Sequence, residues 1–402
     1  MTHCTRAAMA IVGICLSWCF RAEGVVAQTE ISERDVLAAV AQTHPAMLEL
    51  EALATDARGA RAGAGLWDNP TIWLVRESYS DNIDETRIGF SLPLPFDGRR
   101  SMRGKAARFG LAAAEADIAF AALRVRMQVR EDFANWYVAG ERLRSIEAIL
   151  NLADDLARMM EARTTAGETS RLAMHRLGLA ATELRAASAA AQSDFLAAQL
   201  VLQRWFTVPS ATAQIQAPEL PPLSPTIDAA ERPDIAASRN RLAQSEALSR
   251  LSGRWVQLPT VDVGWIDPSQ SSGGMVFGLS LDVPLFNRNQ GARASSHSRL
   301  LATQSAYASD TVRARLEWEA ARGSYELLRE AVLRQPDVNS SADSIVVAAT
   351  AAFGAGELGI TDILEMLRAV DEGRNAALDL VAAALRAHRV LELATGKPLL
   401  SY

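Results

Sequence analysis

The residue types that most often carry out chemistry, histidine and cysteine, are sparse in this chain. Beyond its first 27 residues there is no cysteine, and only four histidines remain: His44, His175, His297 and His388. A zinc site needs several such ligands at close spacing, and none of the four has another histidine or a cysteine near it in sequence. We therefore predict surface positions on helices for all four. Neither a phosphate-binding glycine loop nor a nucleophile elbow is found, so no catalytic residue, metal ligand or cofactor is predicted.

One acidic pair has a notable spacing. Asp362 and Glu365 are three residues apart at the start of a predicted helix, so their side chains project from one face about a turn apart. Carboxylates in the first turn of a helix interact favourably with its dipole. From the residues alone, this structural role is the favoured one.

The elements that must position these residues are predicted to be long helices. Hydrophobic residues make up 49% of the 402 positions but aromatic residues only 6%, and 47 acidic residues against 41 basic ones give a net charge of -6. This composition excludes a disordered chain, a collagen-like chain and a basic nucleic-acid-binding domain.

The first 27 residues are predicted to be a secretory signal peptide. An apolar stretch from Ala7 to Phe20 follows a basic residue, and small residues precede a cleavage site after Ala27. A lipid-attachment site at Cys19 would need a small residue before it, where Trp18 stands, so simple cleavage is favoured. Beyond this segment no apolar run approaches the roughly 18 residues of a spanning helix.

Blocks of residues recur at a constant offset, which indicates a tandem duplication. The matches at 189 positions are Pro70 with Pro259, Gly89 with Gly278, Pro95 with Pro284, Arg99 with Arg288, and the pair Gly167-Glu168 with Gly356-Glu357. We predict a signal peptide over 1–27, a first repeat over 28–207, a Pro-rich linker over 208–228 and a second repeat over 229–402.

Each repeat is predicted to contain a helix, a pair of strands, a long helix and a second long helix after a glycine-containing turn. Helices are expected over 31–66, 98–164 and 171–206, then over 229–256, 288–354 (broken near Pro336) and 361–395. Strands are expected over 70–79, 86–95, 259–267 and 274–285. The helix over 98–164 would be on the order of 100 Å long, which suits a tube that crosses a compartment.

The predicted strands alternate bulky apolar residues with small or polar ones. Ile88, Phe90 and Leu92 fall on one face, and Gly89 and Ser91 on the other. Four strands cannot enclose a core of their own, and about ten residues is the length of a strand that crosses a bilayer at a tilt. The aromatic residues expected to form a belt at the lipid interface are Trp67, Trp73, Tyr79, Trp255 and Trp265.

A strand-to-helix motif occurs twice, as Leu92-Pro93-Leu94-Pro95-Phe96-Asp97-Gly98-Arg99-Arg100 and Leu281-Asp282-Val283-Pro284-Leu285-Phe286-Asn287-Arg288, and a turn recurs as Ala166-Gly167-Glu168 and Ala355-Gly356-Glu357. On these residues the chain resembles the TolC-like outer membrane factors of tripartite efflux pumps and type I secretion. It looks closest to the cobalt-zinc-cadmium type members. The resemblance covers nearly all of the chain beyond the predicted signal peptide.

The resemblance implies a mainly helical protein with a small transmembrane β part. It implies a homotrimer in which each copy gives four strands to a shared twelve-stranded barrel in the outer membrane lipid and its helices to a periplasmic tunnel. Such a channel passively conducts what a periplasmic adaptor and an inner-membrane pump deliver, here a heavy-metal RND-type pump. It would have no enzymatic activity, no cofactor and no nucleic-acid partner.

The resemblance also assigns roles to residues. Asp362 and Glu365 fall where the family lines its closed periplasmic mouth with carboxylates, which implies a pore gate. The hairpin turns, which would contact the adaptor, are at Gly167, Glu168, Gly356 and Glu357. The strand-to-helix junctions are marked by Pro95, Gly98, Arg99, Pro284 and Arg288.

Two other classes of protein are alternatives to a channel. The first is the periplasmic adaptor itself, which would have one helical hairpin flanked by β-rich domains, whereas this sequence predicts two hairpins and two strand pairs. The second is a periplasmic hydrolase, which would need a clustered acid or histidine site that the sequence lacks. The sequence leaves the transported substrate open, because a conduit carries what its pump delivers.

Overall fold

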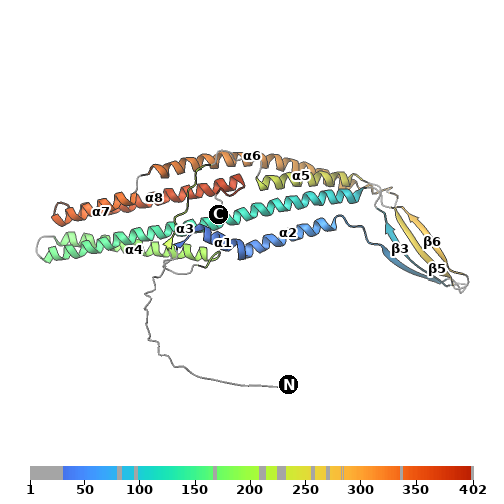
Figure 1. Ribbon diagram of the computed structural model, residues 1–402, viewed down its shortest axis with the longest axis horizontal. Helices are drawn as coiled ribbons and strands as arrows, with labels where there is room; N and C mark the ends of the chain where they lie inside the picture. The colour runs from blue at the N-terminus through green and yellow to red at the C-terminus, as the bar shows by residue number, and fades with distance from the viewer. Residues whose placement is uncertain are drawn as a thin grey trace, which may run out of the picture.

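The computed structural model describes residues 30–78, 84–94, 98–165, 170–207, 214–223, 232–254, 259–268, 272–281, 283, 285–335 and 338–399. The molecule is long and narrow, with a small sheet at one end and the ends of two helical hairpins at the other (Figure 1). The predicted signal peptide, both ends of the Pro-rich linker, and Pro95, Pro284, Gly167, Glu168, Tyr79 and Trp255 lie outside the described residues.

The first predicted helix, over 31–66, is divided in two. Helix α1 spans Glu33–Thr43 and α2 spans Pro45–Gly63. The division falls at His44, whose extended backbone precedes a proline, and its ring Nδ1 accepts a hydrogen bond from the Ala46 N–H at 3.2 Å. Proline cannot continue a helix but fits the first position of a new one, so the single-helix prediction was wrong here.

The other predicted helices are confirmed within a few residues at each end. Helix α3 runs unbroken over Arg99–Thr165, 67 residues, which at 1.5 Å per residue is about 100 Å. The remaining helices are α4 over Arg171–Gln203, α5 over Pro233–Ser252, α6 over Gln290–Arg334, α7 over Val338–Ala355 and α8 over Ile360–Thr395. The break between α6 and α7 is the one predicted near Pro336.

Four antiparallel strands form the sheet in the order β2-β3-β5-β6. Strand β2 spans Thr71–Ser78, β3 Asp84–Pro93, β5 Thr260–Pro268 and β6 Gly274–Ser280. Strand β6 is shorter than the predicted 274–285. A parallel pair of two-residue strands, β1 (Glu30–Ile31) and β4 (Gln214–Ile215), was not predicted.

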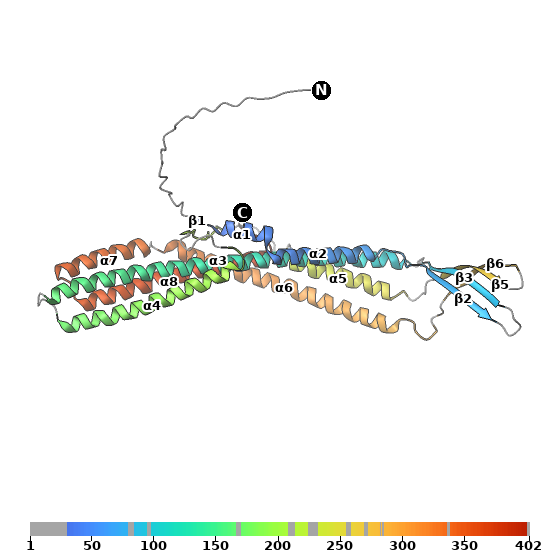
Figure 2. The same ribbon diagram turned by 90° about the horizontal axis from the view of Figure 1, so that it is seen from below.

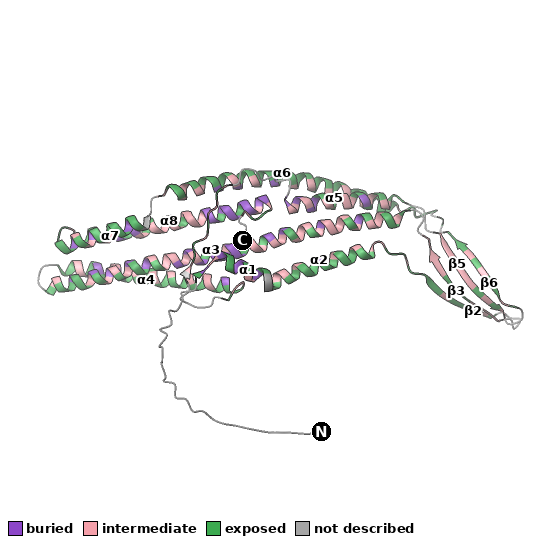
Figure 3. Cartoon of the chain, in the orientation of Figure 1, coloured by how far each residue is buried: buried purple, intermediate pink, exposed green. Residues whose placement is uncertain are grey.

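The two faces of the sheet differ as the alternation predicts. The strand register aligns Ile72, Phe90, Val263 and Phe277 in one row across all four strands, and Ile72 and Phe277 are 78% and 72% exposed. No described strand residue of this sheet is buried (Figure 3). One face of the sheet is therefore a wide apolar surface without a protein core behind it.

The opposite face of the sheet is lined by small residues. Gly89 and Gly264 are paired across β3 and β5, and the Trp73 ring lies over both, within 2.5 Å and 2.8 Å of where a Cβ atom would be. Trp73 is thus on the face opposite Trp265, because its partner is Gly89 whereas Trp265 pairs with Ile88. The two tryptophans therefore cannot belong to one outward-facing belt. The belt predicted from the sequence, which included both, was wrong on this point.

Helix α3 organises the helical part, since α2, α4, α5 and α8 all pack against it (Figure 2). The buried apolar residues form clusters along its length rather than one central core. Near the hairpin ends the cluster includes Leu156 and Met160. At mid-length, where α1 crosses, another includes Phe133 and Trp136.

Candidate functional site

The turn between α7 and α8 closes one of the two hairpins at the helical end. Gly356 has a φ of +79°, and the N–H groups of Gly356 and Glu357 donate to the carbonyls of Phe353 (3.0 Å) and Ala352 (2.9 Å). Glycine adopts this left-handed conformation without a side-chain clash. The structure thus confirms the predicted glycine-terminated turn, and it places Glu357 on the exposed outside.

The acidic pair lies at the beginning of α8. The Gly359 N–H donates to Asp362 Oδ2 at 3.0 Å, so the Asp362 carboxylate caps the helix that follows the turn. Asp362 and Glu365 are both exposed, whereas Ile363 and Leu367 are buried against the neighbouring helices. Glu365 makes no hydrogen bond or ion pair with any residue that the structure describes. The two acids therefore share one outward side of α8, as their spacing predicts.

A hydrophobic cluster holds the start of α8 in place. Ile360, Ile363 and Leu367 pack with Leu156 and Met160 of α3 and with residues of α4 and α7. Above this cluster the Arg163 guanidinium donates to the carbonyls of Phe353 (3.0 Å) and Gly354 (3.1 Å) at the end of α7. Cations at a helix C-terminus interact favourably with its dipole. The acidic pair is therefore positioned by α3 as well as by its own hairpin.

Charged side chains that the sequence analysis did not single out connect the helices around the acidic pair. Three ion pairs cross between helices here, Arg368 of α8 with Glu183 of α4 (2.8 Å), Arg185 of α4 with Asp154 of α3 (2.8 Å), and Arg374 of α8 with Asp343 of α7 (2.5 Å). The sequence could not single out these residues, because each one is far in sequence from the residue with which it forms an ion pair.

Arg176 of α4 lies next to the acidic pair. By the 189-residue offset it is the counterpart of Glu365, and its Nη1 lies 3.3 Å from Oγ1 of Thr361, the residue before Asp362. Leu358, in the turn before α8, packs against the hydrophobic cluster. A basic residue of the predicted first repeat thus contacts the residue that precedes an acid of the predicted second repeat.

The strand-to-helix junctions are only partly alike. Gly98 has a φ of +77°, and Arg99 Nη2 donates to the Arg254 carbonyl at 3.0 Å. In the second repeat the left-handed residue is Asn289, and Arg288, matched to Arg99 by the offset, precedes α6, with its N–H donating to Gln290 Oε1 at 2.7 Å. The matched arginines thus hold different positions, one inside a helix and one before it.

The histidines are not all surface residues, and the prediction for His388 was wrong. His175 and His297 are exposed, whereas His388 is completely buried in α8. Its Nδ1 lies 3.3 Å from Arg130 Nη2. Burial, together with Arg130 and Arg389, lowers the pKa of His388 to about 3. Its burial against α3 and α6 could be found only from the packing.

Arg130 is the centre of this buried polar cluster. It is 2% exposed and forms ion pairs with Glu33 of α1 and Glu392 of α8, both buried. Glu392 also accepts a hydrogen bond from the Leu399 N–H at 2.6 Å. The cluster therefore ties the beginning of the first repeat to the end of the second at mid-length.

No set of metal ligands is found in the described part of the chain: its histidine, cysteine and acidic side chains form no group of three that could hold an ion. Of the helices that the structure describes, none is long and apolar enough to cross a membrane.

Known proteins share this arrangement of helices and strands. No protein-family model matches the sequence. The chain is 26% identical over 351 residues to the cobalt-zinc-cadmium resistance protein CzcC of Cupriavidus metallidurans, an alignment that covers 82% of this chain and 81% of CzcC. The outer membrane protein VceC of Vibrio cholerae superposes with a TM-score of 0.74 at 17% identity, over 91% of this chain and 96% of that one. The chain has the fold of the TolC-like outer membrane factors.

A second solved structure agrees with this assignment. CusC, whose crystal structures concern folding and transmembrane channel formation, superposes with a TM-score of 0.74 at 18% identity, covering 91% of this chain and 92% of CusC. The outer membrane factor fold therefore extends over nearly the whole chain. The acidic pair, the α7–α8 turn and the ion pairs between the helices lie at the end of this fold farthest from its sheet.

Proposed function

We propose that three copies of this chain form an outer membrane channel, each copy giving four strands to one twelve-stranded barrel. The observation that carries this proposal is the sheet. Strands β2 and β6 are its edges, and its rows of exposed apolar residues have no core behind them. In lipid every backbone polar group must be paired, so open sheet edges do not occur there. Other copies of the chain would pair the edges and close the sheet.

The helices support the same assembly. Large apolar side chains are exposed along four of them, at Leu48 and Leu53 of α2, Leu179 and Leu200 of α4, Val312 and Leu327 of α6, and Ile345 and Val347 of α7. Exposed apolar patches of this extent are typical of interfaces. In the proposed trimer these surfaces pack between copies, and the helices from the predicted repeats, 28–207 and 229–402, enclose a periplasmic tunnel.

The channel would serve a tripartite efflux system passively. A periplasmic adaptor would meet the hairpin turns around Gly356 and Glu357, and around Gly167 and Glu168, and an inner-membrane RND-type pump would supply the energy. Heavy-metal cations are the substrate class that we propose, because CzcC is by name a cobalt-zinc-cadmium resistance protein. The strand-to-helix junctions, with Pro95, Gly98, Arg99, Pro284 and Arg288, would mark the boundary between the barrel and the tunnel.

The gate would be formed by Asp362 and Glu365. Threefold symmetry would bring six carboxylates together at the closed end of the tunnel. Crowded like charges raise one another's pKa and attract cations, which is how charged rings give a pore its selectivity. The Asp362 cap does not conflict with this role, since the carboxylate is exposed while it accepts one backbone hydrogen bond.

Assembly and conduction test the channel directly. We expect the purified mature protein to be a trimer that needs detergent and to give discrete conductance steps in planar bilayers. A stable monomer without detergent, with no conductance, would refute the proposal and would favour a soluble periplasmic component. Mass spectrometry of the mature N-terminus, expected at Gln28, tests the predicted signal peptide.

The gate needs a test that leaves the helix cap intact. Asp362→Asn with Glu365→Gln removes the charges but keeps an oxygen that accepts the Gly359 N–H. We expect this double variant to lose cation preference and to be blocked less by divalent cations. The matched control is Glu115→Gln with Glu161→Gln, two exposed acids of α3. Equal selectivity and equal block in both variants would remove the gate assignment.

A further inference from the structure

The face of the sheet that is opposite to its apolar rows carries an acidic residue near the helices. The strand register places Asp262 of β5 in one row with Thr71 of β2, Ser91 of β3 and Gly278 of β6. The other three residues of the row are small or carry a hydroxyl group, so the only charge in it is that of Asp262. Thr71 is the first residue of β2, which puts this row at the end of the sheet nearer the helices (Figure 1).

Asp262 lies at the same depth as the exposed apolar surface. Its neighbours along β5, Val261 and Val263, point to the opposite face because side chains alternate along a strand. Those two valines pair with the exposed Leu279 and Phe277 of β6. A charge on the lipid side of a barrel strand is destabilising at this depth, whereas the lumen side tolerates it. The face that carries Asp262 is therefore the one that fits the lumen of the proposed barrel.

The Asp262 carboxylate is held by neutral groups. Its Oδ1 accepts a hydrogen bond from the Ser91 hydroxyl. Its Oδ2 lies 3.4 Å from the position that a Cβ atom on Gly278 would take, so the glycine leaves room for the carboxylate beside β6. None of the basic residues that the structure describes forms an ion pair with Asp262. Its negative charge is thus not balanced by a cation of the described sheet.

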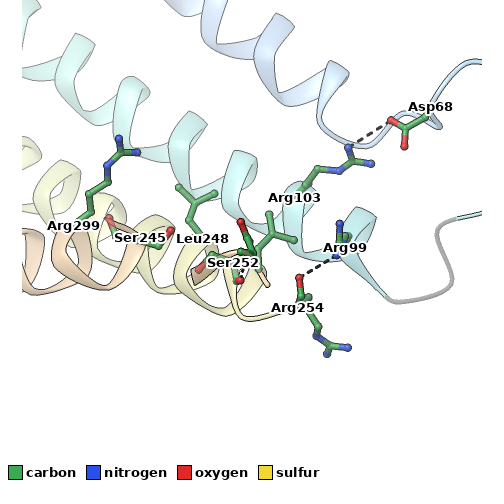
Figure 4. A pocket seen from close by; sticks show the side chains of 11 residues that line it. Asp68, Arg99, Arg103, Ser245, Leu248, Ser252, Arg254 and Arg299 are labelled. Atoms are coloured by element: carbon green, nitrogen blue, oxygen red, sulfur yellow. Dashed lines mark hydrogen bonds and ion pairs between the residues drawn. The ribbon is translucent and has the colours of Figure 1, made fainter. Parts of the chain in front are cut away.

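Two other acidic groups in this region differ from Asp262 because each has an ionic partner. On the same face, but at the far end of the sheet, Glu85 lies 2.7 Å from the guanidinium group of Arg87. At the helical end, Asp68 Oδ1 lies 3.6 Å from Arg103 Nη1 in the lining of a cavity of about 500 Å³ (Figure 4). The unbalanced charge of Asp262 is therefore a local feature of its row.

We propose that Asp262 helps to give the channel a preference for cations, in the barrel and apart from the acidic pair at the helical end. The proposal rests on the proposed function, because only a shared barrel brings the Asp262 side chains of three copies into one lumen. Fixed charges on the wall of a pore concentrate ions of the opposite sign, and lumen-facing residues of a barrel tune its selectivity. The ions that fit are small hydrated cations, metal cations included.

Ion selectivity in planar bilayers tests the proposal, measured as the reversal potential in a gradient of potassium chloride. The variant is Asp262→Asn, whose amide oxygen still accepts the Ser91 hydroxyl. We expect the ratio of cation to anion permeability to fall about twofold near 0.1 M salt, where charges act over about 10 Å, and to change little at 1 M, where they act over about 3 Å. The matched control is Asp267→Asn, an exposed acid on the opposite face of the same strand, which should behave as the wild type does.

A cysteine variant gives a second, independent test. The chain has no cysteine after Cys19, so Asp262→Cys adds one thiol to the mature protein. A membrane-impermeant thiosulfonate reagent that attaches a sulfonate group should react with this thiol and restore the cation preference. The same reagent should not react with Phe277→Cys, on the apolar face. This variant also provides the measurement if Asp262→Asn does not fold.

The other outcomes count against the proposal. Equal cation preference in Asp262→Asn and the wild type would refute it and leave the proposed channel intact. An equal loss in Asp262→Asn and Asp267→Asn would mean that total charge, and not position in the lumen, sets the preference. An unreactive thiol in Asp262→Cys beside a reactive one in Phe277→Cys would reverse the two faces of the sheet. A wild-type protein that does not conduct would refute this proposal together with the proposed function.

Discussion

The buried imidazole of His388 predicts a specific loss of stability in mild acid. Burial and the neighbouring guanidinium groups of Arg130 and Arg389 lower the pKa of His388 to about 3, against about 6.5 in an unfolded chain. The other groups around it are Glu33 and Glu392, which pair with Arg130, and the Tyr325 ring, whose centre is 5.1 Å away. The folded protein therefore holds this histidine neutral.

The sign and the size of the effect follow from proton linkage. Below pH 6.5 the unfolded chain binds a proton at this position and the folded chain does not, so the free energy of unfolding falls as the pH falls. The slope approaches 1.4 kcal/mol per pH unit, and between pH 7 and pH 5 the loss amounts to about 2 kcal/mol. The loss continues until the pH reaches the folded-state pKa of about 3.

The measurement is chemical unfolding of the detergent-solubilised protein, followed by tryptophan fluorescence at pH 7 and pH 5. His388→Asn keeps an acceptor for Arg130 but cannot take up a proton, so it should lose about 2 kcal/mol less than the wild type over this interval. His175→Asn, at an exposed histidine, is the matched control and should follow the wild type. A parallel loss in the wild type and in His388→Asn would refute the reasoning.

Three further variants test other parts of the fold. Arg130→Met should lower the free energy of unfolding by about 3–5 kcal/mol, because it removes the buried cation that pairs with the carboxylates of Glu33 and Glu392; an unchanged denaturation midpoint would contradict this. Gly356→Ala should lose about 1–2 kcal/mol at its left-handed position, whereas Gly373→Ala, in a helix interior with open space around it, should gain up to about 1 kcal/mol. Gly89→Val places a side chain where the Trp73 ring and the Val263 carbonyl lie, each 2.5 Å from the added Cβ, and should reduce the yield of folded trimer in gel filtration; full yield would mean that Trp73 is not needed there.

Much of the fold was predictable because it depends on local periodicity. The long helix α3 follows from apolar residues spaced by four and three, such as Phe109, Ala113 and Ala116, in a stretch without proline. The sheet faces follow from alternation in residues such as Ile88 and Gly89. The division at His44 was missed although Pro45 stands in the sequence, because proline also occurs in the first turn of a helix. The two-residue strands β1 and β4 are too short to have any period.

The candidate site was predictable only as far as one helix determines it. Asp362 and Glu365 share a face because they are three residues apart, and Gly356 ends a helix because a tight reversal favours glycine. The partners from other helices, such as Arg163 and Arg176, have no local signal. The burial of His388 was missed for the same reason, since its neighbours include Arg130 of α3 and Tyr325 of α6, which are far from it in sequence.

The two predicted repeats differ at the feature that most affects the helical end. Pro336, which lies outside the described residues, corresponds to Glu147 in the middle of α3 by the 189-residue offset, and proline is unfavourable in the interior of a helix. Helix α3 therefore runs without interruption from the sheet to the hairpin ends, whereas α7 is a separate helix of 18 residues. Its described charged contacts come from α3, through Arg163, and from α8, through Arg374. The predicted repeat that carries the acidic pair is thus the one with the divided helix. The α7–α8 turn of that repeat is held in place by contacts with the undivided helix α3.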